Sequence, residues 1–152
     1  MKVLMWHCKK FRISNIKHST RMNIIDNQIN EIDEIDEMDE MDEMDVIVPC
    51  ITIESAEDSL FLEDLIEEIA EMSAIHQTKK IIVAPFGHLS HLCCARKKAY
   101  HILQTLVTML KEKGFVTKLV HFGSHKDTEF LSESHPEQVR FRTYPKLVWK
   151  LS

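Results

Sequence analysis

The sequence is poor in the residues that bend or cross-link a chain, with three glycines, four prolines and four cysteines among its 152 residues. The cysteines, Cys8, Cys50, Cys93 and Cys94, form no C-x-x-C pair, and adjacent cysteines rarely bond to each other. A disulfide framework and a paired-cysteine zinc motif are therefore not indicated, and we expect reduced thiols.

Long apolar runs are also missing. No stretch approaches the roughly eighteen consecutive apolar residues of a membrane span, and no cleavage-site pattern follows the start "MKVLMWHCKK". We expect a cytoplasmic protein without membrane contact. Because 44% of the residues are hydrophobic, the length suits one compact domain over residues 1–152 with its own core.

Basic residues are absent from one acidic tract, "EIDEIDEMDEMDEMD" at residues 31–45, which holds ten Asp and Glu. Although the net charge is -5, the remainder of the chain has 14 acidic and 19 basic residues. The basic residues gather near the two ends: Lys2, Lys9, Lys10, Arg12, Lys17, Arg21, Arg140, Arg142, Lys146 and Lys150. Such clusters suit a phosphate-binding surface, and an ordinary solvated face is the alternative.

Within the acidic tract an apolar residue recurs at every third position. This period drifts by roughly 60° per repeat around an α-helix, so it cannot maintain one apolar face. We interpret residues 26–45 as a low-complexity insertion that is disordered or loosely helical. The alternative is an acidic flap that competes with a bound nucleic acid for the basic surface.

The rest of the chain alternates between predicted strands and helices. Apolar or alternating runs predict strands at residues 2–7, 46–54, 79–86, 115–122 and 128–133. Pro49 suggests that the second of these has a bulge or an edge position. Helices are predicted from the capping-box pair Ser55 and Asp58 to about Gln77, and from about residue 95 to 113 before Gly114. The pattern predicts an α/β fold with about five strands and two main helices.

Two polar clusters follow predicted strands. "PFGHLSH" at residues 85–91 places Gly87, which permits close approach of a ligand, beside His88, which can transfer a proton near neutral pH. "HFGSHKD" at residues 121–127 contains Gly123, His125 and Lys126. Ligands in α/β sheets bind beyond the carboxyl ends of strands. A loop or packing role is the alternative for each cluster alone.

Several strings together resemble a known family. "KVLMWH", "VIVPCITIE", "PFGHLS", "LKEKGF" and "HFGSHK" followed by "SHP" are similar, in order and spacing, to the amino-terminal editing domain of archaeal threonyl-tRNA synthetase. The resemblance covers nearly the whole chain outside the acidic insertion. It implies a D-aminoacyl-tRNA deacylase-like α/β fold, a homodimer, and hydrolysis of serine wrongly attached to threonine tRNA, with neither cofactor nor metal.

The resemblance also assigns roles to residues. It makes His88 and Lys126 the catalytic residues and places Ile53 in the wall of the aminoacyl pocket. Further substrate-binding residues are expected at Pro85, Phe86, Gly87 and His125. Two positions depart from the family pattern, because Val139 replaces a common glutamate, with Glu137 the nearest acid, and His125 replaces an aromatic residue.

The chain stops at Ser152, without room for an aminoacylation core. We therefore expect no aminoacylation by this chain alone. We expect editing in trans beside a separate threonyl-tRNA synthetase, and the alternative is that the sequence is a fragment of a longer gene product. Alternative functions are a D-aminoacyl-tRNA deacylase and an inactive tRNA-binding or dimerisation module. A zinc site remains a further alternative, formed from the histidines and cysteines His88, His91, Cys93, Cys94, His121 and His125.

Overall fold

The computed structural model describes residues 1–17, 37–38, 40–122 and 125–146. Its elements in chain order are β1 (Lys2–Lys17), β2 (Glu37–Met38), β3 (Met41–Thr52), the 3-10 helix η1 (Ala56–Phe61), α2 (Leu62–His76), β4 (Lys80–Pro85), α3 (Arg96–Glu112), β5 (Val116–Val120), β6 (His125–Leu131) and β7 (Val139–Thr143). No helix in these ranges is long and apolar enough to cross a membrane.

The strands form one seven-stranded sheet in the order β2-β5-β4-β3-β1-β6, with β7 also paired to β1. The pairs β2–β5, β5–β4 and β4–β3 are parallel, whereas β1 is antiparallel to each of its partners. Two partners share one edge of the long strand β1, because β7 pairs with residues 2–6 and β6 with residues 10–17. Because β3, β4 and β5 are parallel, their carboxyl ends meet at one edge of the sheet.

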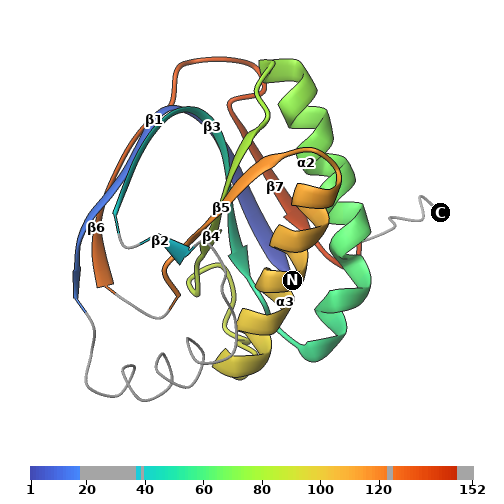
Figure 1. Ribbon diagram of the computed structural model, residues 1–152. Helices are drawn as coiled ribbons and strands as arrows, with labels where there is room; N and C mark the ends of the chain where they lie inside the picture. Colours follow the sequence, from blue (N-terminus) through green and yellow to red (C-terminus); the bar gives the residue numbers. More distant parts are fainter. Residues whose placement is uncertain (18–36, 39, 123–124, 147–152) are drawn as a thin grey trace.

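Strand alternation divides the core between the two faces of the sheet. Ile47 and Ile51 of β3 pack with α2 and α3 in one cluster, while Val46 and Val48 belong to a second cluster on the opposite face. Both helices lie on one side of the sheet, as Figure 1 shows. The opposite, concave face is enclosed by the bending of the sheet itself.

The bend occurs where β1 and β3 arch together (Figure 1). Their register is the same on both sides of the arch, from Lys2↔Thr52 to Ile13↔Met41, but Lys9 and Asp45 are not paired. Asp45 has a φ of 56° at this point. Asp tolerates the left-handed region better than most residues, so it accommodates the bend without shifting the register.

Both predicted helices are present, but residues 56–61 form the 3-10 helix η1 and not the first turns of the α-helix. The buried residues Leu62, Leu65, Ile66 and Ile69 of α2 recur at the spacing of one helix face. Its end at Gln77 is confirmed by that residue's φ of 54°. Gly114 has a φ of 91° and its N–H donates to the Lys111 carbonyl at 3.0 Å, which confirms the predicted stop after α3.

Three predictions about strands need correction. The sheet contains β2 and β7 in addition to the five predicted strands. Pro49 is in a central strand with continuous pairing to β1, at neither an edge nor a bulge. Residues 41–45 of the predicted low-complexity insertion belong to β3, because pairing with β1 outweighs the three-residue period. Residues 37–38 of that insertion likewise form β2, which pairs with β5, and residues 26–36 and 39 lie outside the described residues.

Candidate active site

A cavity of about 990 Å³ opens at the carboxyl ends of the parallel strands and continues along the concave face of the sheet. Its walls come from the segments after β3, β4 and β5, from the start of α3, and from β1 and β6. All seven site residues predicted from the sequence line it: Ile53, Pro85, Phe86, Gly87, His88, His125 and Lys126. Gly123, which the sequence also suggested, lies outside the described residues.

The loop after β4 is fixed by hydrogen bonds to β3. The Phe86 N–H donates to the Ile51 carbonyl at 2.9 Å, and the Thr52 hydroxyl donates to the Phe86 carbonyl. The Leu89 N–H in turn donates to the Thr52 hydroxyl at 3.4 Å. These bonds hold the backbone around Gly87 open to the cavity. The His88 ring meets the Phe86 ring edge-on, with centroids 5.1 Å apart.

A charged cluster behind this loop anchors its far side. The Ser90 hydroxyl donates to Glu54 at 2.6 Å, and Glu54 also accepts bonds from the Lys2 amine and the amino group of Met1, each at 2.7 Å. Burial alone would raise the pKa of Glu54, but these three donors lower it to about 2. Glu54 is therefore ionised at neutral pH and ties the loop to β1 and β3.

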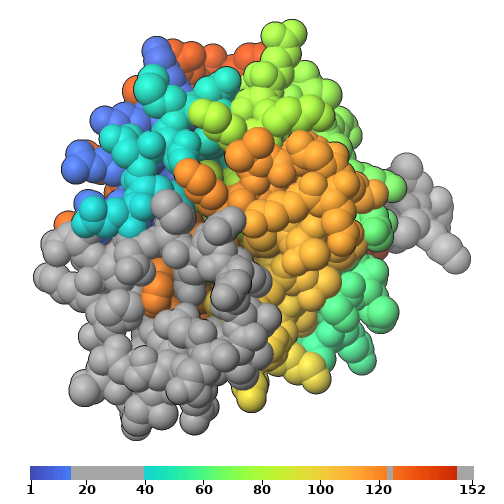
Figure 2. Space-filling model, in the orientation of Figure 1, coloured from blue at the N-terminus to red at the C-terminus, as the bar shows by residue number. Residues whose placement is uncertain are grey.

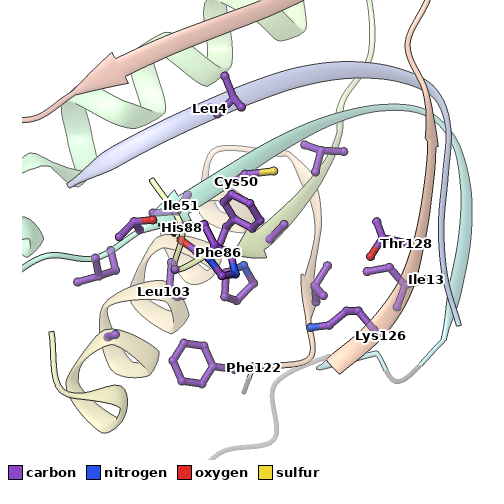
Figure 3. A pocket seen from close by; sticks show the side chains of 18 of the residues that line it. Leu4, Ile13, Cys50, Ile51, Phe86, His88, Leu103, Phe122, Lys126 and Thr128 are labelled. Carbon is purple, nitrogen blue, oxygen red and sulfur yellow. Dashed lines mark hydrogen bonds between the residues drawn. The ribbon is translucent and has the colours of Figure 1, made fainter. Parts of the chain in front are cut away.

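Lys126 reaches the cavity from the other side, near the start of β6. Its amine donates to the His121 carbonyl at 2.7 Å, which places it beside the end of β5. Figure 3 shows the Lys126 amine extending across the cavity toward the side where His88 and Phe86 lie. A cation from β6 and an imidazole from the β4 loop thus face a shared space, where they can act on one ligand.

Nothing in the described fold requires a glycine at position 87. A Cβ atom added there would meet no heavy atom within 4 Å, and the residue's φ is not in the left-handed region. The open space in front of Gly87 belongs to the cavity. A ligand can therefore approach this backbone closely, as the sequence suggests.

All four cysteines line the cavity and none forms a disulfide. Burial raises the pKa of Cys8 to about 12, with a further contribution from Cys50, and burial raises the pKa of Cys50 to about 11. These two thiols therefore stay protonated at neutral pH, which makes them poor nucleophiles and poor metal ligands. Within the described ranges, no three His, Cys, Asp or Glu side chains are arranged to hold a metal ion.

The acid that could replace the missing glutamate is engaged elsewhere. Val139 pairs with Trp6 in the sheet, yet neither Val139 nor Glu137 lines the cavity. The Glu137 carboxylate instead accepts a bond from Arg140 at 3.0 Å. Glu137 therefore does not supply the carboxylate that the family pattern has at position 139.

The sequence suggested Trp6 as a possible site wall, with packing in the core or at a dimer interface as the alternative, and Trp6 does line the cavity. Sequence reasoning missed the wall from β6, with Thr128 and Phe130, and Arg96 at the start of α3. The alternation of Leu4, Trp6 and Cys8 along β1 gives them a common face, but only the bent sheet shows which cavity that face encloses. The supporting roles of Thr52 and Glu54 likewise depend on contacts between distant segments.

Comparison with known proteins links this cavity to one family. Residues 1–143 match the model of the archaea-specific editing domain of threonyl-tRNA synthetase. Curated relatives are the threonine–tRNA ligases of Nanoarchaeum equitans, 30% identical over 66% of this chain, and of Thermococcus kodakarensis, 27% identical over 64%. The match covers 16% of each ligase's length.

A solved structure, the c-Myc DNA unwinding element binding protein, shares the fold with a TM-score of 0.66. The superposition covers 95% of this chain and 99% of the other, at 11% sequence identity. At this identity the likeness shows the fold alone, which is the predicted D-aminoacyl-tRNA deacylase-like α/β fold.

Proposed function

Because this chain belongs to the archaea-specific editing domain family of threonyl-tRNA synthetase, we propose that it hydrolyses L-serine from wrongly charged threonine tRNA. The family supports tRNA editing and therefore proofreading in translation. In the proposed trans reaction, a separate threonyl-tRNA synthetase charges the tRNA and this domain removes the wrong amino acid. We also expect the domain to act as a homodimer.

The proposed reaction is attack of water on the carbonyl carbon of the 3′ aminoacyl ester. The carbonyl oxygen becomes negatively charged, the bond to the ribose 3′ oxygen breaks, and that oxygen takes a proton as free serine leaves. Lys126 would stabilise the developing negative charge or orient the water. His88 would order the water or the terminal ribose, and the ribose 2′-OH can share the proton transfer.

Selectivity between serine and threonine is assigned to the aminoacyl part of the cavity. The two amino acids differ by one methyl group, which a binding pocket distinguishes by only about 1–3 kcal/mol, so a second site is needed. Ile53 is buried, has a branched side chain and lines the cavity together with residues of the β4 loop. We infer that this wall excludes the extra methyl of threonine, while the Phe86 and Gly87 backbone holds the ester or the amino group.

One observation supports this proposal above the others: His88 and Lys126, from segments far apart in sequence, lie on facing sides of one cavity. Neither residue is specific evidence alone, since a single His or Lys near a strand end is common. Their shared position beside an open backbone, in a chain of this family, gives the reaction a cation, an imidazole and backbone donors.

The decisive test is release of amino acid from charged threonine tRNA by the purified protein. We expect rapid release of L-serine and much slower release of L-threonine. D-aminoacyl tRNAs measured in parallel identify the alternative D-specific deacylase. Exclusive release of D-residues would contradict the proposed substrate, although not the fold.

A second candidate function is a tRNA-binding module without turnover. The observation that favours it is the absence of a carboxylate at position 139, together with the engagement of Glu137 by Arg140. This candidate predicts tRNA binding that weakens with salt but no release of any amino acid. Slow but measurable release of L-serine would instead identify a weakened editing enzyme.

A further inference from the structure

Most cations in the basic clusters near the chain ends are paired with carboxylates. Ion pairs between 2.7 and 3.8 Å occupy the following residues: Lys2 with Glu54, Lys9 with Glu133, Arg12 with Glu129, and Arg140, Arg142 and Lys146 with Glu68. The neighbouring acids offset much of the positive charge on these surfaces. Lys17, Arg21 and Lys150 fall where side chains are not described. The predicted phosphate-binding role of the chain ends is therefore weakly supported.

A different run of cations, Arg96, Lys97 and Lys98, opens α3. The three side chains are exposed, and none makes an ion pair or hydrogen bond with another described residue. The first turn of α3 contains no acid. Three adjacent like charges repel one another, and no ion pair with a described residue offsets that repulsion. A bound polyanion would do so.

This basic run lies directly between the cavity and a second hollow. Arg96 lines the cavity, whereas Lys97 and Lys98 line a neighbouring hollow of about 400 Å³ together with Ser59, His101 and Thr105. The helix α3 that carries the run occupies much of the molecular surface seen in Figure 2. A single strand of nucleic acid whose end enters the cavity past Arg96 would therefore meet Lys97 and Lys98 next.

We propose that Arg96, Lys97 and Lys98 bind backbone phosphates of the single-stranded 3′ end of the substrate tRNA. This inference rests on the proposed function, because it requires the terminal nucleotide to occupy the cavity. The contacts are electrostatic and sequence-independent: they position the strand and do not read its bases. The surface on α3 would thus hold the strand while the aminoacyl ester reaches His88 and Lys126.

The test compares Lys97→Gln/Lys98→Gln with a charge-matched control, Lys9→Gln/Lys10→Gln on β1. For seryl-tRNA, the α3 variant should raise KM by about 10- to 30-fold at 0.1 M salt with little change in kcat. Losing two phosphate contacts to a single strand should reduce the slope of log KM against log salt by about 1.4. The control should change neither value substantially.

A phosphate-free substrate, 3′-O-seryl-adenosine, separates phosphate binding from damage to the site. Wild type and α3 variant should hydrolyse it equally if the lysines contact phosphates only. Slower hydrolysis of this ester by the variant, or an equal rise in KM for the control, would overturn the inference. If the wild type releases no serine at all, the proposed function fails. In that case, the affinity of the wild type and of both variants for uncharged threonine tRNA, measured over the same salt series, tests the phosphate contacts independently.

Discussion

The two sides of the cavity are held in place by different means. On the β4 side, the loop backbone is tied to β3 through Thr52 and Ile51, while the His88 ring makes an edge contact with Phe86 and no hydrogen bond to a described residue. On the β6 side, the Lys126 amine itself is bonded to a backbone carbonyl. One side therefore supplies a fixed backbone with an adjustable imidazole, and the other supplies a positioned charge.

The largest expected effect comes from removing that charge. Lys126→Ala should lower kcat for release of serine by about 10²–10³, because a preorganised group that stabilises the developing oxyanion is lost. Binding of uncharged tRNA should change little. The matched control is Lys113→Ala, an exposed lysine at the far end of α3, and it should retain activity. Equal loss of turnover and tRNA binding would instead make Lys126 a phosphate contact.

A smaller effect is expected from loosening the anchor of the β4 loop. Glu54→Gln removes the carboxylate that holds Ser90, Lys2 and the amino group of Met1, and should lower the free energy of unfolding by about 1–3 kcal/mol at pH 7. The folded-state pKa of about 2 lies below the ordinary 4.5, so this stabilisation is present above about pH 4.5 and is lost as the pH falls towards 2.

Denaturant unfolding from pH 3 to pH 7 measures this difference. The gap between wild type and Glu54→Gln should narrow at acidic pH. Glu57→Gln, which neutralises a nearby exposed acid, is the control and should show a small effect throughout. A gap of constant size across this range would show that the charge of Glu54 is not what stabilises the loop.

The smallest effect on stability is expected for Gly87→Ala, because no atom lies within 4 Å of the added Cβ. The free energy of unfolding should change by less than about 0.5 kcal/mol, while release of serine should slow if the substrate approaches this backbone. Gly114→Ala is the contrasting control: its φ of 91° makes a side chain strained, so it should destabilise by about 1 kcal/mol or more. Unchanged turnover in Gly87→Ala would place the substrate farther from the loop.

The helices and the strand-end clusters were predictable because their signals are local. The buried spacing of α2, the stop at Gly114 and the order of β4 and β5 follow from patterns within short windows. The family motifs also identified residues that the fold brings to one cavity, although their roles stay predictions. The bend that gives the cavity its far wall depends on long-range pairing, which no short window contains.

β7 shows why the strand count was too low. Its apolar residues Val139 and Phe141 are exposed by 41% and 49%, whereas Arg140 between them is only 6% exposed. The buried guanidinium is paired with Glu68 of α2 at 2.8 Å, so the usual pattern of apolar residues inside is inverted. The residues around Arg140 in the sequence do not reveal this distant partner, so they could not predict that Arg140 is buried.

The constant register of β1 against β3 has a consequence for how the chain can change over time. Every pair from Lys2↔Thr52 to Ile13↔Met41 is fixed by its neighbours in the ladder, whatever the length of the connection between the strands. Closure entropy grows only slowly with the length of a connection, by about 0.6 kcal/mol for each doubling, so the same pairs can be kept when that connection changes in length. Selection on the cavity can therefore continue to act on the same paired residues.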